Sequence, residues 1–108
     1  MKITNYKTVT LTSLEDTQVT LTTAAPTYTL PVVPNVNEKY LFTKDTADNV
    51  TVSAPAGAFI ESSAAAGSIA NSTAGDTWAT LRLQPIYDET AGGWRWLVIG
   101  SRGTWVTT

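Results

Sequence analysis

The chain has 108 residues, a formal net charge of −2 and neither cysteine nor histidine. Without these residue types it can form no disulfide, no thiolate metal site and no Ser-His-Asp catalytic triad. Only 15% of its residues are charged, no basic run suits nucleic acid, and no apolar run approaches the roughly 18 residues that span a bilayer. We expect one domain made in the cytoplasm, with no cofactor, nucleic acid or membrane among its partners.

Short segments with alternating apolar and polar residues follow one another along a chain rich in threonine and valine. They span residues 7–13, 17–23, 27–33, 39–44, 49–55, 58–63, 78–88 and 93–101. Turn-forming residues lie between most of them, so the pattern predicts short strands joined by turns. We predict an all-β fold, namely an antiparallel β-sandwich or a jelly-roll-like domain. Residues 62–76, rich in alanine, serine and glycine, are predicted to form a loop.

The first 26 residues are expected to differ from the rest of the chain. Residues 8–13 and 17–23 flank the sequence "LEDT", which predicts an N-terminal β-hairpin or an extended arm. Prolines punctuate the following stretch, as is typical of an edge strand. Residues 27–108 are then the sandwich domain. The pattern leaves open whether residues 1–26 pack onto that domain or reach a neighbouring subunit.

The four tryptophans pose the question of which rings are core and which are surface. Burying one ring removes roughly 150–250 Å² from water, worth about 4–6 kcal/mol at most. Net domain stability is only about 5–15 kcal/mol, so we expect at least two rings in the core. Trp78 and Trp96 are the predicted core rings. Trp94, beside a hairpin loop, and Trp105, near the C-terminal end, are the predicted contact rings.

The same alternation extends these two predictions to the neighbouring residues. The predicted core comprises Trp78, Trp96, Leu81, Leu83, Val98, Ile99, Val50, Val52 and Tyr40. The predicted interface or binding residues are Trp94, Trp105, Arg95 and Tyr87. Exposed aromatic side chains in such a domain serve oligomer contact, docking to a partner protein or stacking on sugar rings.

Catalysis is not expected from the acidic residues. They are Glu15, Asp16, Glu38, Asp45, Asp48, Glu61, Asp76, Asp88 and Glu89. Nearly all lie in predicted turns, where carboxylates cap backbone amides and aid solubility. A glycosidase would need two of them to face each other across a cleft. We therefore predict neither a catalytic site nor a metal site.

From Thr27 to Gly100 the order of segments resembles small all-β modules of tailed-bacteriophage virion proteins. The resemblance rests on "YTLP", "NEKYLFTK", "NVTVSAPAGAFI", "WATLRL" and "GGWRWLVIG". The positions that carry it are Leu30, Pro31, Tyr40, Lys44, Val50, Val52, Gly57, Ile60, Leu81, Leu83, Trp96, Val98 and Ile99. It implies a virion component that oligomerises and docks on another protein.

Chain length favours one role within this family. The chain begins with methionine and is too short to hold a fibre shaft, which favours a capsid decoration or cement protein. The expected partner is the major capsid protein or another virion protein, and the expected location is the virion. A homo-oligomer is expected, with a trimer preferred by analogy. The alternative is a tail-fibre-type receptor-binding module that recognises a host surface glycan.

Overall fold

The computed structural model describes residues 2–4, 8–10, 18–21, 27–34, 40–44 and 49–108. These residues form strands and turns and include no helix, so none that could cross a bilayer. The strands are β1 (Lys2–Thr4), β2 (Thr8–Thr10), β3 (Gln18–Leu21), β4 (Thr27–Thr29), β5 (Tyr40–Lys44), β6 (Val50–Ser53), β7 (Phe59–Ile60), β8 (Ser68–Asn71), β9 (Thr80–Asp88), β10 (Gly93–Arg102) and β11 (Val106–Thr107). The all-β prediction is confirmed.

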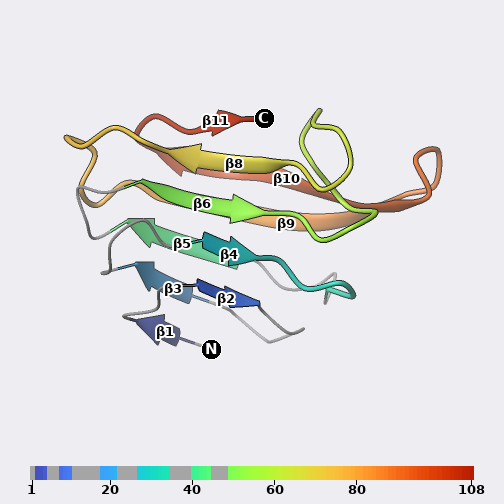
Figure 1. Ribbon diagram of the computed structural model, residues 1–108, viewed down its shortest axis with the longest axis horizontal. Helices are drawn as coiled ribbons and strands as arrows, with labels where there is room; N and C mark the ends of the chain where they lie inside the picture. The colour runs from blue at the N-terminus through green and yellow to red at the C-terminus, as the bar shows by residue number, and fades with distance from the viewer. Residues whose placement is uncertain (1, 5–7, 11–17, 22–26, 35–39, 45–48) are drawn as a thin grey trace.

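The strands form two sheets that lie one behind the other (Figure 1). One sheet has the order β1-β3-β5-β9-β10-β7, and the other has the order β11-β8-β6-β4-β2. From β1 to β9 consecutive strands lie alternately in one sheet and in the other, so one passage through both sheets is a circuit of the chain. Strands that pair within a sheet therefore come from different circuits. Only the β9–β10 pair joins strands that are consecutive in the sequence.

This winding makes both sheets mixed, whereas the sequence predicted antiparallel pairing. β1 pairs in parallel with β3, β3 with β5, β2 with β4, β4 with β6, and β7 with β10. The antiparallel pairs are β5–β9, β9–β10, β6–β8 and β8–β11. Alternation of apolar residues along a single strand carries no information on strand direction, so the sequence could not distinguish the two kinds of pair.

The described residues do not pair as an N-terminal hairpin, because β2 and β3 lie in different sheets. β2 pairs with β4, and β3 pairs with β1 and β5. The three N-terminal strands thus extend the sheets that residues 27–108 build. The "LEDT" sequence that suggested the turn lies outside the described residues.

The core lies between the two sheets and consists of the inward residues of each strand. The buried hydrophobic residues are Tyr28, Leu30, Tyr40, Phe42, Val50, Val52, Ala54, Ala58, Ile60, Ile69, Ala79, Leu81, Leu83 and Trp96. Trp96 meets Tyr40 edge to face, with ring centroids 4.9 Å apart at 81°. Six of the nine predicted core residues are therefore buried: Tyr40, Val50, Val52, Leu81, Leu83 and Trp96.

Two predicted core residues are exposed, each for a local reason. Trp78 is 54% exposed because it belongs to the turn before β9 and has a left-handed φ of +71°. Its neighbour Ala79 is buried instead. Ile99 is 43% exposed because it lies on the face of β10 opposite to buried Trp96, and that face is not covered as the apolar residues on both faces had predicted. Val98 is partly buried against the core.

The predicted loop over residues 62–76 contains a strand, β8. In β8 the side chains of Ile69 and Asn71 face inward, and the residues that alternate with them are partly exposed. The strand pairs with both β6 and β11. A strand of four residues with an asparagine in an inward position has too little apolar character to stand out in the sequence. Its position nevertheless matters, because it brings Asn71 into the interior.

Candidate functional site

The β9–β10 hairpin carries three of the four residues predicted to make contacts. Among the described residues, β5 pairs with β9 as far as Leu83, whereas β10 pairs with β9 from Thr80 to Asp88. Pro85 lies beyond Leu83, so its missing N–H breaks no bond to β5. The turn is fixed by Asp88, whose Oδ1 accepts the N–H groups of Thr90 and Ala91 at 3.1 Å. Gly92 closes it with a φ of +74°.

Tyr87 and Trp94 form a cross-strand aromatic pair on this hairpin. Their ring centroids are 5.3 Å apart and their planes make an angle of 86°. Tyr87 is 53% exposed, whereas Trp94 is half-buried and packs against the core. Trp94 thus supports Tyr87 and presents only part of its own ring to solvent.

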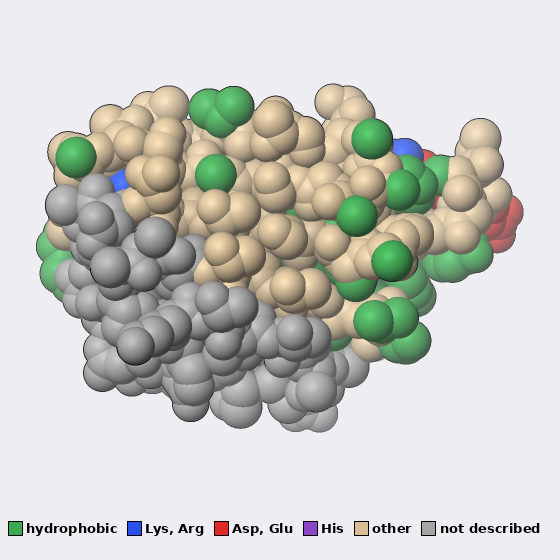
Figure 2. Space-filling view, in the orientation of Figure 1, with side chains coloured by type: hydrophobic (Ala, Val, Ile, Leu, Met, Phe, Trp, Pro, Cys, Tyr) green, Lys and Arg blue, Asp and Glu red, His purple; other side chains and the backbone are tan. Residues whose placement is uncertain are grey.

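Further large apolar side chains are exposed at the same end of the two sheets. Val32 and Val33, which follow β4, are 66% and 67% exposed, and Ile86 on β9 is 43% exposed. In Figure 1 the segment after β4 and the tip of the β9–β10 hairpin both lie at the right-hand end. Hydrophobic side chains gather at that end in Figure 2. We call this surface the apolar end: Val32, Val33, Ile86, Tyr87 and Trp94.

Arg95, predicted as a contact residue, has internal partners. Its Nε lies 2.8 Å from Asp88 Oδ2, and its guanidinium lies 4.7 Å from the centroid of the Phe59 ring. Its Nη1 donates to the carbonyl of Glu61. The hydrogen bond from Arg95 and the Ala91 N–H lower the pKa of Asp88 below its ordinary value. Arg95 therefore holds the hairpin onto β7 and is not an independent binding group.

Trp105 is not part of the apolar end. It is half-buried against the core, and its Nε1 donates to the carbonyl of Arg102 at 3.0 Å. Arg102 ends β10, whereas Trp94 lies at the start of that strand. A strand rises about 3.3 Å per residue, so the two rings lie at opposite ends of the sheet. The structure thus brings together Tyr87, Trp94 and Arg95 but not Trp105.

The opposite end of the sheets carries a polar cluster that the sequence analysis missed, which we call the buried polar cluster after its two buried members: Lys44 and Asn71, with half-buried Asp76 and exposed Thr73. Lys44 and Asn71 have no exposed surface. Lys44 Nζ donates to Asn71 Oδ1 at 3.0 Å and to the carbonyl of Thr73 at 2.7 Å. The one signal in the sequence was a lysine in phase with inward Tyr40 and Phe42. A lysine at the end of a strand is equally compatible with exposure to solvent, so this pattern alone does not predict a site.

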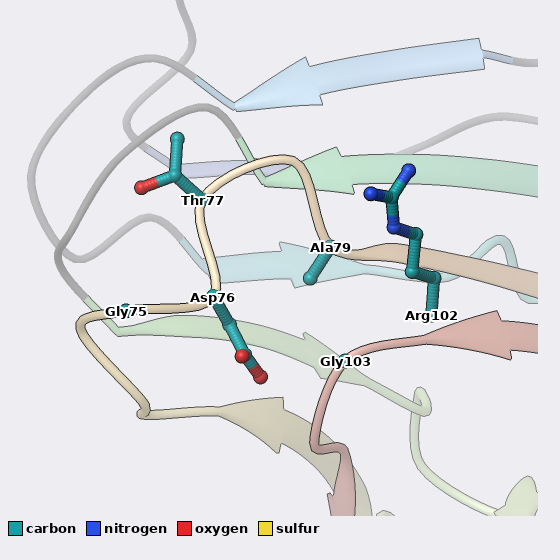
Figure 3. A pocket seen from close by; sticks show the side chains of 6 residues that line it. All are labelled: Gly75, Asp76, Thr77, Ala79, Arg102 and Gly103. Atoms are coloured by element: carbon teal, nitrogen blue, oxygen red, sulfur yellow. The ribbon is translucent and has the colours of Figure 1, made fainter.

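Asp76 joins this buried polar cluster to a cavity of about 250 Å³ lined by Gly75, Asp76, Thr77, Ala79, Arg102 and Gly103 (Figure 3). Its Oδ2 accepts the Thr104 N–H at 2.6 Å and Asn71 Nδ2 at 3.1 Å. These two bonds, the backbone one first, lower its pKa below the ordinary value. In Figure 3 the side chains of Asp76 and Arg102 point in different directions.

Three of the four described acids accept hydrogen bonds from within the fold, and the fourth, Glu89, is exposed in the hairpin turn. Glu61 Oε1 accepts the Val98 N–H at 2.7 Å, and Asp76 and Asp88 accept the bonds given above. No group of three potential metal ligands occurs among the described residues. Glu15, Asp16, Glu38, Asp45 and Asp48 lie outside them.

No family model, no curated protein and no solved structure matches the chain.

Proposed function

We propose that this chain is a structural virion protein that docks on the capsid surface through its apolar end and stabilises the shell. The supporting observation is that large apolar side chains from two separate segments are exposed at one end of the two-sheet domain. Grouped apolar and aromatic side chains on a surface mark protein–protein contacts. The phage assignment itself rests on the order of segments from Thr27 to Gly100.

The strand edges are weaker candidates for docking than the apolar end. The edge strands β1, β2, β7 and β11 are two or three residues long. Such short edges offer few unpaired backbone groups to another chain. Side-chain contacts at the apolar end therefore supply the affinity in this proposal.

The proposal includes a homo-oligomer, with a trimer preferred. A stable interface buries about 800 Å² on each partner, and the apolar end presents only five large side chains. In an oligomer, binding of one copy to the capsid raises the effective concentration of the other copies at the capsid surface, so several small contacts together give tight binding. Within the proposal, the two sheets are a β-sandwich whose apolar end faces the capsid.

The test is co-sedimentation with capsids of the encoding phage from which accessory proteins have been stripped. The variant Val33→Ser/Tyr87→Ser is expected to bind at least tenfold more weakly, because central apolar contacts contribute about 1–2 kcal/mol each. Val106→Thr is a matched control, since Val106 is 57% exposed outside the apolar end. Equal binding of wild type and the double variant, or no binding to capsids by the wild type, would overturn the proposal.

A glycan-binding receptor module is the second candidate, and Trp78 is the observation that favours it. Trp78 is 54% exposed and lies between Thr77 and Ala79, which line the cavity with Asp76 and Arg102. An exposed aromatic ring beside polar groups suits sugar stacking. For this candidate, Trp78→Gly is expected to abolish saccharide binding, and Val33→Ser/Tyr87→Ser is expected to retain it. Capsid docking predicts the reverse in the capsid assay, where only Val33→Ser/Tyr87→Ser weakens binding.

A further inference from the structure

Lys44 is the starting point, because a lysine without exposed surface is costly to bury. It ends β5 of one sheet, and the partner of its amine, Asn71, ends β8 of the other. Nζ lies 3.0 Å from Asn71 Oδ1. A carbonyl bond is about 1.23 Å long, which places Nζ within about 4.2 Å of the carboxamide carbon Cγ. A primary amine and an amide carbon thus meet inside the protein.

The orientation of the Asn71 amide follows from its other partners. Oδ1 also accepts the Thr73 N–H at 3.0 Å, and Nδ2 donates to Asp76 Oδ2 at 3.1 Å. The two donors bonded to Oδ1 polarise the carbonyl and make Cγ more electrophilic. The carboxylate contacts the nitrogen that would have to leave. The amine of Lys44 and the carboxylate of Asp76 therefore each contact the Asn71 amide, the amine at its oxygen and the carboxylate at its nitrogen.

We propose that Lys44 and Asn71 form an intramolecular isopeptide bond between the two sheets, with Asp76 as the catalytic residue. Lys44 and Asp76 do not contact each other, so one ammonium proton first passes from Nζ to the Asp76 carboxylate through water of the adjoining cavity, which frees the lone pair on Nζ. Nζ then attacks Cγ, and the Nζ–Cγ bond forms while the carbonyl electron pair moves to Oδ1. In this intermediate Nζ and Nδ2 share one carbon, so the carboxyl group that contacts Nδ2 also lies beside Nζ.

The bond between Cγ and Nδ2 breaks in the second half of the reaction. Asp76 protonates Nδ2, the carbonyl re-forms, and Nδ2 departs as ammonia. Asp76 takes the surplus proton from Nζ and passes it to the ammonia. The balance is one lysine ammonium and one carboxamide converted to one secondary amide and one ammonium ion, with no oxidant and no cofactor. The cavity beside Asp76 opens to solvent and provides the exit.

The backbone next to the reacting groups supports the proposal. Gly103, with a φ of +94°, brings the backbone over the Asp76–Asn71 contact, where a Cβ would lie 2.9 Å from Asp76 Oδ2. The reacting groups are thus covered without a side chain between them. The chain has no cysteine, so a disulfide cannot link its sheets.

Intact mass spectrometry of the denatured full chain tests the proposal directly. The expected mass is lower than the sequence mass by one ammonia molecule. Trypsin is then expected to leave residues 40–82 as one peptide, because a modified Lys44 is not cleaved. A full sequence mass together with cleavage after Lys44 would overturn the proposal.

A succinimide at Asn71 would also release ammonia, and variants separate the two reactions. Lys44→Arg and Asp76→Ala are expected to retain the full sequence mass, whereas a succinimide would persist in Lys44→Arg. Asn71→Asp is expected to lose one water molecule, since a carboxylic acid gives the same amide. Asp88→Asn, which removes an ion-paired aspartate on the hairpin, is the matched control and keeps the ammonia loss. Ammonia loss in Lys44→Arg would refute the cross-link.

Discussion

Replacing Trp96 by Ala and by Phe separates two contributions of one buried side chain. Trp96 has no exposed surface and meets the Tyr40 ring edge to face. Its indole Nε1–H is buried and has no hydrogen-bond partner among the described residues. Ala removes both the ring and the N–H, whereas Phe keeps a ring against Tyr40 and removes the N–H.

The expected losses follow from these contacts. Trp96→Ala leaves a cavity and is expected to lower the free energy of unfolding by about 3–5 kcal/mol. Trp96→Phe is expected to lose about 2–3 kcal/mol in packing and to regain about 1 kcal/mol because no unpaired N–H remains buried. The net loss for Phe is then about 1–2 kcal/mol, less than half of that for Ala.

Equilibrium urea unfolding, followed by far-ultraviolet circular dichroism, measures both values. The slope against urea is expected to stay constant, because the sheets remain the same. Leu83→Ala, at another fully buried position, is the matched control for loss of volume without loss of a polar group. A Phe variant as destabilised as the Ala variant would refute the reasoning, since the N–H would then contribute a favourable bond.

Two further predictions concern Trp78 and the acid range. Trp78→Gly is expected to be more stable than Trp78→Ala by about 1 kcal/mol in urea unfolding, because only glycine adopts a φ of +71° freely; equal stabilities would contradict this. Asp76 and Asp88 have pKa values below their ordinary 3.8, so the unfolded chain binds more protons near that pH. Their stabilisation is therefore present above pH 3.8 and lost as pH falls through the lower folded values, and Asp76→Asn or Asp88→Asn should unfold with a shallower pH dependence in acid titrations.

The sequence predicted most of the strands and most of the core because both depend on local alternation. Residues 40–43, 50–53 and 80–83 place an apolar side chain inward at every second position, and a sheet can bury only one phase of that pattern. Trp96 could be assigned to the core on the same ground. The resemblance to phage virion modules used this alternation too, together with a few landmark residues.

Strand pairing could not be predicted, because it depends on where the chain returns after each circuit. Parallel pairs such as β4–β6 join residues more than twenty positions apart, and no short segment encodes that contact. Trp78 was misassigned because a left-handed turn residue breaks the alternation. Ile99 was misassigned because the sequence cannot show whether the second face of a strand is covered.

The two ends of the molecule were likewise decided by tertiary structure. The sequence proposed Tyr87 and Trp94 as contact residues, but it did not associate them with Val32 and Val33, which another segment brings to the same end. Lys44 and Asn71 looked like ordinary polar residues 27 positions apart. Their amine and amide meet only because β5 and β8 end side by side in opposite sheets, which is a property of the fold and not of either strand.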